Sequence, residues 1–299
     1  MSRIATVFGA TGLQGSSVVQ ALLKDGTFKP RAVMRDATSE PARKLADLGC
    51  EVASADLGDE EAVKSAVSGA ECVFAFTFSF GAVSELVQGT NIVDASKEAG
   101  VQFVVFSTLP NVSELSSGKF THAFHMDEKA MVQKRLEASG MANASIGTGG
   151  FLENTMRATS QRPLVKTERG YELPTLVLPG TRGVHTWIGR DMGPAVVALM
   201  TQYKTRASEI DGQRFVLGVG VSTTEEFAAE LSKGLGKPVE VKYLGKSGIP
   251  PVDDMFAFSA EFEWYPGVPV PDLRLEKLGV SVGSLEEFAR TVLKPHLEC

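Results

Sequence analysis

Three glycines, each three residues from the next, follow a short apolar run near the start of the chain. The run is Ile4 to Phe8, and the glycines lie in the stretch GATGLQG, Gly9 to Gly15. A glycine-rich turn between a buried strand and a helix brings backbone N–H groups and the positive helix end close to a pyrophosphate. A plain turn without a ligand is the alternative. The position of the stretch at the first crossover of a strand–helix series favours a dinucleotide site.

The first half of the chain alternates apolar runs with amphipathic segments. Strands are predicted at residues 3–8, 29–34, 51–55, 72–78, 101–107 and 143–147. Near-continuous β-branched and aromatic runs, separated by helices of about 10 to 15 residues, indicate parallel strands that are buried on both faces. The pattern predicts the α/β class with a Rossmann-type, doubly wound parallel sheet, and ligands are expected beyond the carboxyl ends of its strands.

The pattern changes after about residue 150. Residues 163–183 are rich in turn residues and β-formers, which predicts a hairpin or small sheet, and Ser222 with Glu225 predicts the capped start of a helix. We therefore expect an NADP-binding Rossmann domain over residues 1–150 and a smaller α+β substrate or partner lobe over residues 151–299. The part around residues 183–216 is expected to return to the first lobe.

Charge, cysteine use and hydropathy limit the partners and the compartment. The formal net charge is −6, so direct nucleic-acid binding, which needs clustered Lys and Arg, is not expected. Cys50, Cys72 and Cys299 are widely spaced and form no CxxC pair, which fits a reducing compartment. No stretch is apolar over the roughly 20 residues of a membrane helix, and no signal-peptide core precedes the first strand. We expect a cytoplasmic protein that binds no membrane.

The end of the second predicted strand discriminates between NAD and NADP. An acidic residue about 20 positions after the glycine motif would bind the ribose 2′-hydroxyl of NAD, whereas an arginine accommodates the 2′-phosphate of NADP. Arg35 stands at this spacing from Gly15, and a guanidinium pairs with phosphate in a forked geometry. Asp36 follows directly, and a solvated loop arginine is the alternative. The sequence therefore predicts NADP(H) as the cofactor.

Motifs along essentially the whole chain resemble the NmrA-like family, an atypical branch of the short-chain dehydrogenase/reductase superfamily that is related to the isoflavone-reductase-like enzymes. They read VFGATGLQGSSVVQALLKDG, MRD, ADLGDEEAV, VVFSTLPN, HMDEKAMVQKRL, GGFLENT, IGRDMGPAVVALM and DDMFAF. The resemblance implies a Rossmann lobe that binds NADP(H), with a smaller C-terminal lobe over the cleft. It also implies one of two uses, which are NADPH-dependent chemistry or redox sensing through transcription factors or signalling proteins.

The resemblance also implies which positions contact the cofactor. The implied contacts are, for the diphosphate, Gly9, Thr11, Gly12, Leu13, Gln14 and Gly15; for the 2′-phosphate, Arg35; for the adenine, Asp56 and Leu57; for the ribose and nicotinamide, Thr77 and Phe78; and for the closed nicotinamide end, Gly149, Gly150, Phe151 and Asn154. These assignments depend on where the predicted strands end.

The catalytic pair of the parent superfamily is incomplete in this chain. There a tyrosine gives a proton to a carbonyl, and a lysine four residues later lowers the tyrosine pKa and holds the ribose. The corresponding segment here is HMDEK, so the lysine remains as Lys129 while the tyrosine is missing. Lys129 is the implied ribose anchor. His125 lies on the same helix face and, with an ordinary pKa of about 6.5, is a candidate acid; a half-exposed histidine at the helix start is the alternative.

Hydroxyl and aromatic side chains are candidates for the substrate pocket. Ser107 and Thr108 end the fifth predicted strand and are expected to orient a polar group of the substrate. The aromatic candidates follow the fourth predicted strand or belong to residues 255–267, and are Phe80, Phe256, Phe258 and Trp264. Core packing is the alternative for these rings, which otherwise form an apolar pocket. No metal is expected, because His122 and His125 have no evident third ligand.

Two functions remain open at this point. In the first, the protein is an oxidoreductase that transfers hydride between NADP(H) and a hydrophobic imine, iminium or enone, in a biosynthetic pathway for example, since such electrophiles need less help from a tyrosine acid. In the second, it is a redox-sensing regulator that binds a transcription or signalling partner without catalysis, which requires different affinities for NADP⁺ and NADPH. Lys129 and the aromatic segment favour the enzyme, and the missing tyrosine favours the sensor.

Overall fold

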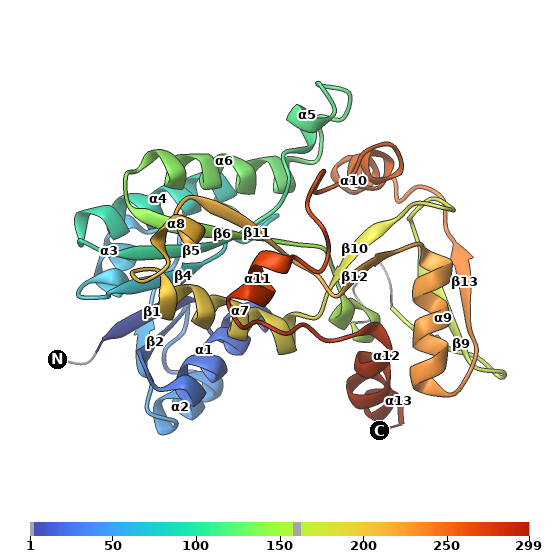
Figure 1. The fold of residues 1–299 in the computed structure, drawn as a ribbon, viewed down its shortest axis with the longest axis horizontal. Helices are drawn as coiled ribbons and strands as arrows, with labels where there is room; N and C mark the ends of the chain where they lie inside the picture. The colour runs from blue at the N-terminus through green and yellow to red at the C-terminus, as the bar shows by residue number, and fades with distance from the viewer. Residues whose placement is uncertain (1–2, 158–162, 299) are drawn as a thin grey trace.

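Seven parallel strands form the centre of the protein in the computed structural model, which describes residues 3–157 and 163–298. The strands are β1 (Ile4–Phe8), β2 (Lys29–Met34), β3 (Glu51–Ser54), β4 (Cys72–Ala75), β5 (Phe103–Thr108), β6 (Ala142–Thr148) and β11 (Gln213–Leu217). Their order across the sheet is β11-β6-β5-β4-β1-β2-β3 (Figure 1). Every neighbouring pair in this sheet is parallel.

Helices cover both faces of this sheet and give it two separate cores (Figure 1). One face carries α1 (Leu13–Asp25), α2 (Glu40–Asp47) and α7 (Ile188–Gln202), and the other carries α3 (Glu60–Val67), α4 (Glu85–Glu98) and α6 (Phe124–Ala138). Side chains alternate between the two cores along each strand, so that Phe103 faces the first core and Phe106 the second. The predicted α/β class with a doubly wound parallel sheet is confirmed.

The six predicted strands are all present, and their ends differ from the prediction by at most two residues except in β4. β4 ends at Ala75 and not at residue 78. The phenylalanine side chains that follow it become more exposed along the chain. Phe76 is buried, whereas Phe78 is 48% exposed and Phe80 is 63% exposed. The seventh strand, β11, was expected only as part of a segment that returns to the first lobe, and it pairs with β6.

The rest of the chain forms two small sheets and a third core. The small sheets contain β7 (Gly150–Phe151), β10 (Gly183–Thr186) and β12 (Gly220–Ser222), and β8 (Val165–Lys166), β9 (Tyr171–Thr175) and β13 (Val239–Tyr243). The predicted hairpin is the antiparallel pair of β8 and β9. The third core includes Leu173 and Phe288. Its helices are α9 (Thr224–Leu235), α12 (Leu285–Phe288) and α13 (Lys294–Glu298), with a 3₁₀ helix over Leu152–Met156 and a π-helical turn over Ala289–Leu293.

Short helices complete the fold, together with α10 (Pro250–Glu261). They are α5 (Val112–Leu115), α8 (Ala207–Ile210) and α11 (Leu273–Lys277). Cys50 and Cys72 are buried free thiols, and Cys299 lies outside the described residues. No described helix has the length and apolar character needed to cross a membrane. The division at residue 150 stays a prediction, and the first core contains Phe215 and Leu275 from well beyond that point.

Candidate functional site

A cavity of about 490 Å³ lies where the carboxyl ends of β5 and β6 meet the small sheets and α10. Its lining includes many of the residues that the sequence singled out: Gln14, Phe80, Ser107, Thr108, His125, Lys129, Gly149, Gly150, Phe151, Asn154, Phe256 and Trp264. The cavity therefore brings together both candidate catalytic residues, the expected nicotinamide end and part of the expected substrate pocket.

The other predicted cofactor residues follow the carboxyl ends of β1 to β4, outside this cavity. They are Gly9, Thr11, Gly12, Leu13, Gly15, Arg35, Asp56, Leu57, Thr77 and Phe78. Arg35 is exposed directly after β2, where its carbonyl accepts a hydrogen bond of 2.6 Å from the Ser54 hydroxyl. Asp56 is exposed after β3 and accepts a hydrogen bond of 2.8 Å from the Gly58 amide, whereas Leu57 is buried. These positions all lie at the carboxyl ends of the parallel strands, where a cofactor is expected.

The glycine stretch leaves the start of α1 open to an anion. Gly9 has a φ of 62°, in the left-handed region, and its carbonyl accepts a hydrogen bond of 2.8 Å from the Gly12 amide. Gly12 precedes α1, where no side chain caps the helix and no acidic residue occupies the first turn. The unpaired N–H groups and the positive helix end are therefore available to a phosphate.

Gly15 allows the turn to pack against α1, and a larger residue is expected to disrupt it. A Cβ atom at this position would lie 2.2 Å from the Gly9 carbonyl oxygen, which belongs to the backbone. We expect Gly15→Ala to lower the free energy of unfolding by about 2 kcal/mol, the usual cost of overpacking, and to weaken NADPH binding at least about ten-fold. Urea unfolding and calorimetric titration measure the two effects.

A matched glycine provides the control for Gly15. Gly220 lies in β12, and an added Cβ there meets no atom within 4 Å. Gly220→Ala is therefore expected to fold and bind NADPH as the wild type does. If Gly15→Ala behaved like Gly220→Ala in both measurements, the tight turn would have no role in cofactor binding.

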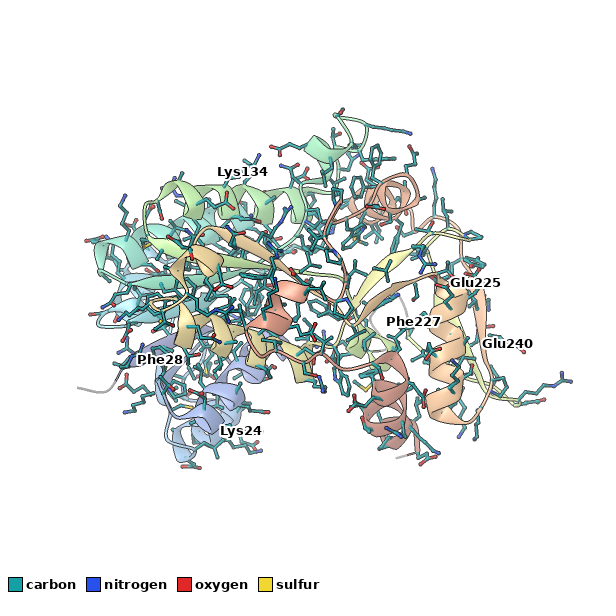
Figure 2. All side chains as sticks on the ribbon, viewed as in Figure 1. Lys24, Phe28, Lys134, Glu225, Phe227 and Glu240 are labelled. Carbon is teal, nitrogen blue, oxygen red and sulfur yellow. The ribbon has the colours of Figure 1, made fainter. Side chains whose placement is uncertain are left out.

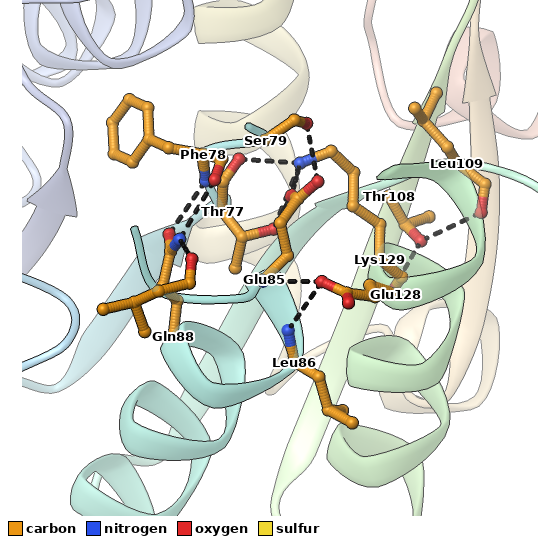
Figure 3. Close-up of polar contacts among 11 residues, drawn as sticks. Thr77, Phe78, Ser79, Glu85, Leu86, Gln88, Thr108, Leu109, Glu128 and Lys129 are labelled. Carbon is orange, nitrogen blue, oxygen red and sulfur yellow. Dashed lines mark hydrogen bonds and ion pairs between the residues drawn. The ribbon is translucent and has the colours of Figure 1, made fainter. Parts of the chain in front are cut away.

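Lys129 lies in a buried polar network at the end of β4 (Figure 3). Its ammonium donates hydrogen bonds to the Thr77 carbonyl (2.6 Å) and the Thr77 hydroxyl (3.1 Å), and it forms an ion pair with Glu85. The Glu85 carboxylate also accepts hydrogen bonds from the hydroxyls of Thr77 and Ser79. The side chain of Glu85 is only 2% exposed and that of Lys129 is 13% exposed. The pair is therefore almost completely removed from water.

All three N–H groups of the Lys129 ammonium have an acceptor in this arrangement. Burial lowers the pKa of Lys129, and the Glu85 carboxylate acts in the opposite direction. Lys129 therefore contacts a ribose only if it exchanges one of these partners. Its role as a ribose anchor stays a prediction.

Sequence reasoning missed the residues that surround Lys129. A carboxylate oxygen of Glu128 accepts hydrogen bonds from the Glu85 amide (2.6 Å) and the Leu86 amide (3.3 Å) at the start of α4. The Gln88 side chain bonds to both backbone groups of Phe78, at 2.9 and 3.0 Å. Glu85 directly follows the N-cap Ser84, a pattern typical of exposed helix starts, so the sequence carries no local signal of its burial.

His125 lies in the first turn of α6, with its side chain against the cavity. It is 9% exposed, and its Nδ1 atom is buried without a hydrogen-bond partner. The ring of Phe80 lies over it at a centroid distance of 5.4 Å. Burial lowers the pKa of His125, an effect that Glu85 opposes. His125 is therefore buried and not half-exposed, and burial favours the neutral form of its imidazole.

Hydroxyl groups stand next to these two residues at the end of β5. Ser107 and Thr108 are both buried and line the cavity, and the Thr108 hydroxyl lies 3.4 Å from the Lys129 carbonyl. No tyrosine is found among the described residues that line the cavity. The chemical groups available at this end are therefore an imidazole, an ammonium and two hydroxyls.

The aromatic residues of α10 and of the segment that follows it separate into two sets. Phe256 and Trp264 line the cavity, and their role as substrate contacts stays a prediction. Phe258 does not line the cavity, because it is fully buried in a small core with Phe120 and stacks on Phe262 at 5.2 Å. The prediction of Phe258 as a substrate contact is therefore wrong. Residues two apart project from different sides of a helix, so only one of Phe256 and Phe258 faces the cavity.

The histidine pair that suggested a metal is separated in the structure. His122 is exposed, and its Nδ1 atom lies 2.9 Å from an oxygen of Asp254, while His125 faces the cavity. Within the described ranges, no group of three or more His, Cys, Asp or Glu side chains is arranged to hold a metal ion.

Comparison with known proteins gives consistent matches. The sequence profile of the NmrA-like family matches residues 1–257. The NmrA-like family domain-containing oxidoreductase lnaB of Aspergillus flavus is 36% identical over 161 residues, which are 51% of this chain and 48% of that protein. The chain spans about half the length of the curated relatives it matches.

Solved structures share the fold over nearly the full length. NmrA, a negative transcriptional regulator in complex with NADP, has a TM-score of 0.80 at 19% identity, with 100% of this chain and 98% of that chain covered. The NADPH-dependent quinone oxidoreductase QOR2 of Escherichia coli, complexed with NADPH, has a TM-score of 0.71 at 24% identity, with 97% and 99% covered. At these identities the likeness establishes the common fold.

Proposed function

Because the chain belongs to the NmrA-like family, we propose that it is an NADP(H)-dependent oxidoreductase acting on a hydrophobic small molecule. The observation that carries the proposal is one cavity that holds His125 and Lys129 beside the residues expected at the nicotinamide. The name of the lnaB relative and the NADPH complex of the quinone oxidoreductase agree with it. An imine, an iminium ion or an enone is the proposed substrate, because the cavity contains no tyrosine acid among its described residues.

The proposed cofactor fits the polar groups along the sheet edge. The open start of α1 receives the diphosphate, and Arg35 binds the 2′-phosphate. Gly149, Gly150, Phe151 and Asn154 would hold the nicotinamide end, and the buried, unpaired Oε1 atom of Gln14, the residue expected at the diphosphate, is free to accept a hydrogen bond in the same cavity. When bound, NADP(H) supplies or accepts the hydride.

The protein supplies the proton and the dry environment. For an imine or an enone, the protonated form of His125 gives a proton to the atom that gains negative charge on reduction, whereas an iminium ion accepts the hydride without a proton. Apolar walls from Met255, Phe256 and Trp264 exclude water and bind the substrate body. Lys129 balances the buried Glu85 carboxylate and keeps the end of β4 in place through its bonds to Thr77.

Arg35→Ala is expected to separate the two cofactors. The substitution removes charge-assisted hydrogen bonds to a phosphate that only NADP(H) carries, so the dissociation constants of NADP⁺ and NADPH should rise about 10- to 100-fold. Those of NAD⁺ and NADH should change less than about two-fold. Calorimetric titration of the four nucleotides measures the difference.

Arg135→Ala serves as the control for this experiment. Arg135 is an exposed arginine on α6 that pairs with Asp94 of α4, away from the cofactor edge. The control is expected to bind all four nucleotides as the wild type does. Equal losses for NADP(H) and NAD(H) in Arg35→Ala would contradict the assignment of the 2′-phosphate site.

The alternative is a redox-sensing regulator without catalysis. It is favoured by the missing tyrosine and by the Lys129 ammonium, whose N–H groups are all engaged. The common fold with the regulator NmrA agrees with it. Absorbance of NADPH, followed with a panel of imines, enones and aromatic ketones, separates the two functions. Consumption that disappears in Lys129→Ala while NADPH still binds supports the enzyme. No consumption, together with a clear affinity gap between NADP⁺ and NADPH, supports the sensor.

A further inference from the structure

The polar side chains that line the cavity include two groups on different elements, which we name the first and the second end. The first is the end with His125 and Lys129. The second is formed by β10, β12 and the start of α9, which lie below α10 or below and to the right of it in Figure 1. The apolar residues of the lining include Val184, Phe227, Met255, Phe256 and Trp264. The reducible group belongs at the first end, so the second end has no part in the proposed chemistry.

Thr224 has an unused hydroxyl at this second end. It lines the cavity, is 3% exposed, and its Oγ1 atom is buried without a hydrogen-bond partner. The start of α9 does not need this hydroxyl, because Thr223 forms the capping box with Glu226, one residue later than the predicted pair of Ser222 and Glu225. A buried hydroxyl without a partner costs free energy, so a ligand that supplies a partner gains affinity.

A fixed hydrogen-bonded pair stands beside Thr224. The Ser222 hydroxyl lies 2.9 Å from the Nε2 atom of His185, and both residues line the cavity. The His185 ring is stacked on Phe227 at a centroid distance of 4.6 Å. Figure 2 shows Phe227 on the side of α9 that faces the protein, whereas Glu225 lies at its outer side. The second end is therefore a built arrangement of hydroxyl and imidazole groups on rigid elements.

The charges around α9 indicate which group this place accepts. The positive end of a helix favours a hydrogen-bond acceptor or an anion. Glu225 and Glu226 occupy the first turn of α9. Arg182 forms an ion pair with Glu226 at 3.0 Å, so the Glu225 carboxylate is the unbalanced charge, and it opposes a full negative charge on the ligand. We propose that Thr224 and the Ser222–His185 pair form a subsite for a neutral carbonyl oxygen, such as that of an amide. The substrate is then an apolar body with a reducible group at one end and a carbonyl at the other, which rests on the proposed function.

Two probes of matched shape test the subsite. They are 6-acetyl-2-naphthamide and 2-acetyl-6-isopropylnaphthalene, in which an isopropyl group replaces the carboxamide. Their dissociation constants are measured by tryptophan fluorescence quenching in the presence of saturating NADP⁺, so that no hydride is transferred. The wild type is expected to bind the carboxamide about five-fold more tightly, the effect of one neutral hydrogen bond. Thr224→Val should remove this preference and leave binding of the isopropyl probe unchanged.

Ser96→Ala is the matched control. Ser96 is a buried residue of α4 whose hydroxyl also has no partner, and it is not among the described cavity residues. This variant should keep the five-fold preference. Thr224→Val should melt no lower than the wild type, because it removes an unpaired hydroxyl and keeps the shape.

Three results would overturn the subsite. The first is an unchanged preference in Thr224→Val, and the second is a wild type that binds neither probe or binds both equally. The third is a lower melting temperature of Thr224→Val, which would assign the hydroxyl to folding. The outcome is separate from that of the proposed function. A preference that is lost in Thr224→Val, in a protein that oxidises no NADPH, would support the subsite and contradict the enzyme.

Discussion

Glu85→Ala is expected to lower the free energy of unfolding by about 3 to 5 kcal/mol, because it leaves the Lys129 ammonium buried without its counter-ion. The carboxylate that is removed also holds the hydroxyls of Thr77 and Ser79. Those groups lose an acceptor at the same time. Urea unfolding at neutral pH measures the loss.

A double variant distinguishes a buried ion pair from a general loss of packing. Glu85→Gln with Lys129→Met removes both charges while it keeps most of the side-chain volume, so it should be more stable than either single variant. Asp94→Ala breaks the exposed pair with Arg135 and should cost only about 0 to 1 kcal/mol. Strictly additive losses in the double variant would show that the two charges do not stabilise each other.

His125→Ala is expected to reduce kcat for an enone such as chalcone about 100- to 10,000-fold, the usual contribution of a positioned acid. The dissociation constant of NADPH should stay the same. His122→Ala is the control, because His122 is exposed and bonded to Asp254; it should keep the wild-type kcat. An unchanged melting temperature of His125→Ala verifies the fold, and an unchanged kcat and KM would remove His125 from the mechanism.

The pH dependence of the same reaction follows from the burial of His125. Its pKa is lowered from the ordinary value of about 6.5, and an acid must be protonated to act. The kcat for reduction should therefore rise as the pH falls from 7 through this lowered pKa, and the rise should be absent in His125→Ala. A wild-type rate that is constant over this range would contradict the role.

The central strands of the Rossmann sheet were predictable because each carries an apolar run. Runs such as Phe103–Thr108 are buried on both faces, so every side chain in them lies in the protein interior. β11 lies at the sheet edge and begins with Gln213 and Arg214, which are only partly buried. Its short run therefore gave a weaker signal than the runs of the five central strands β1, β2, β4, β5 and β6.

The candidate site was predictable only where a motif or a periodicity points to it. The glycine stretch and the HMDEK segment led to Gly15, His125 and Lys129. Glu85 could not be found in this way, because its partner Lys129 is 44 residues away in the chain and only tertiary packing makes the carboxylate buried. The prediction places Phe258 in the pocket because the segment is rich in aromatic residues. The sequence does not show on which side of α10 each ring lies.

The path of the chain through the sheet also determines whether its parts are separable. After β6 the backbone builds the small sheets, returns as α7 and β11, leaves again, and returns once more as α11. Met192, Phe215 and Leu275 from these later passes fill the same core as Val18 of α1. A fragment that stops at residue 150 would expose to water the apolar face of its sheet that α7 and α11 otherwise cover. A fragment of residues 1–150 is therefore not expected to fold on its own, and the first core is complete only once α11 has been synthesised.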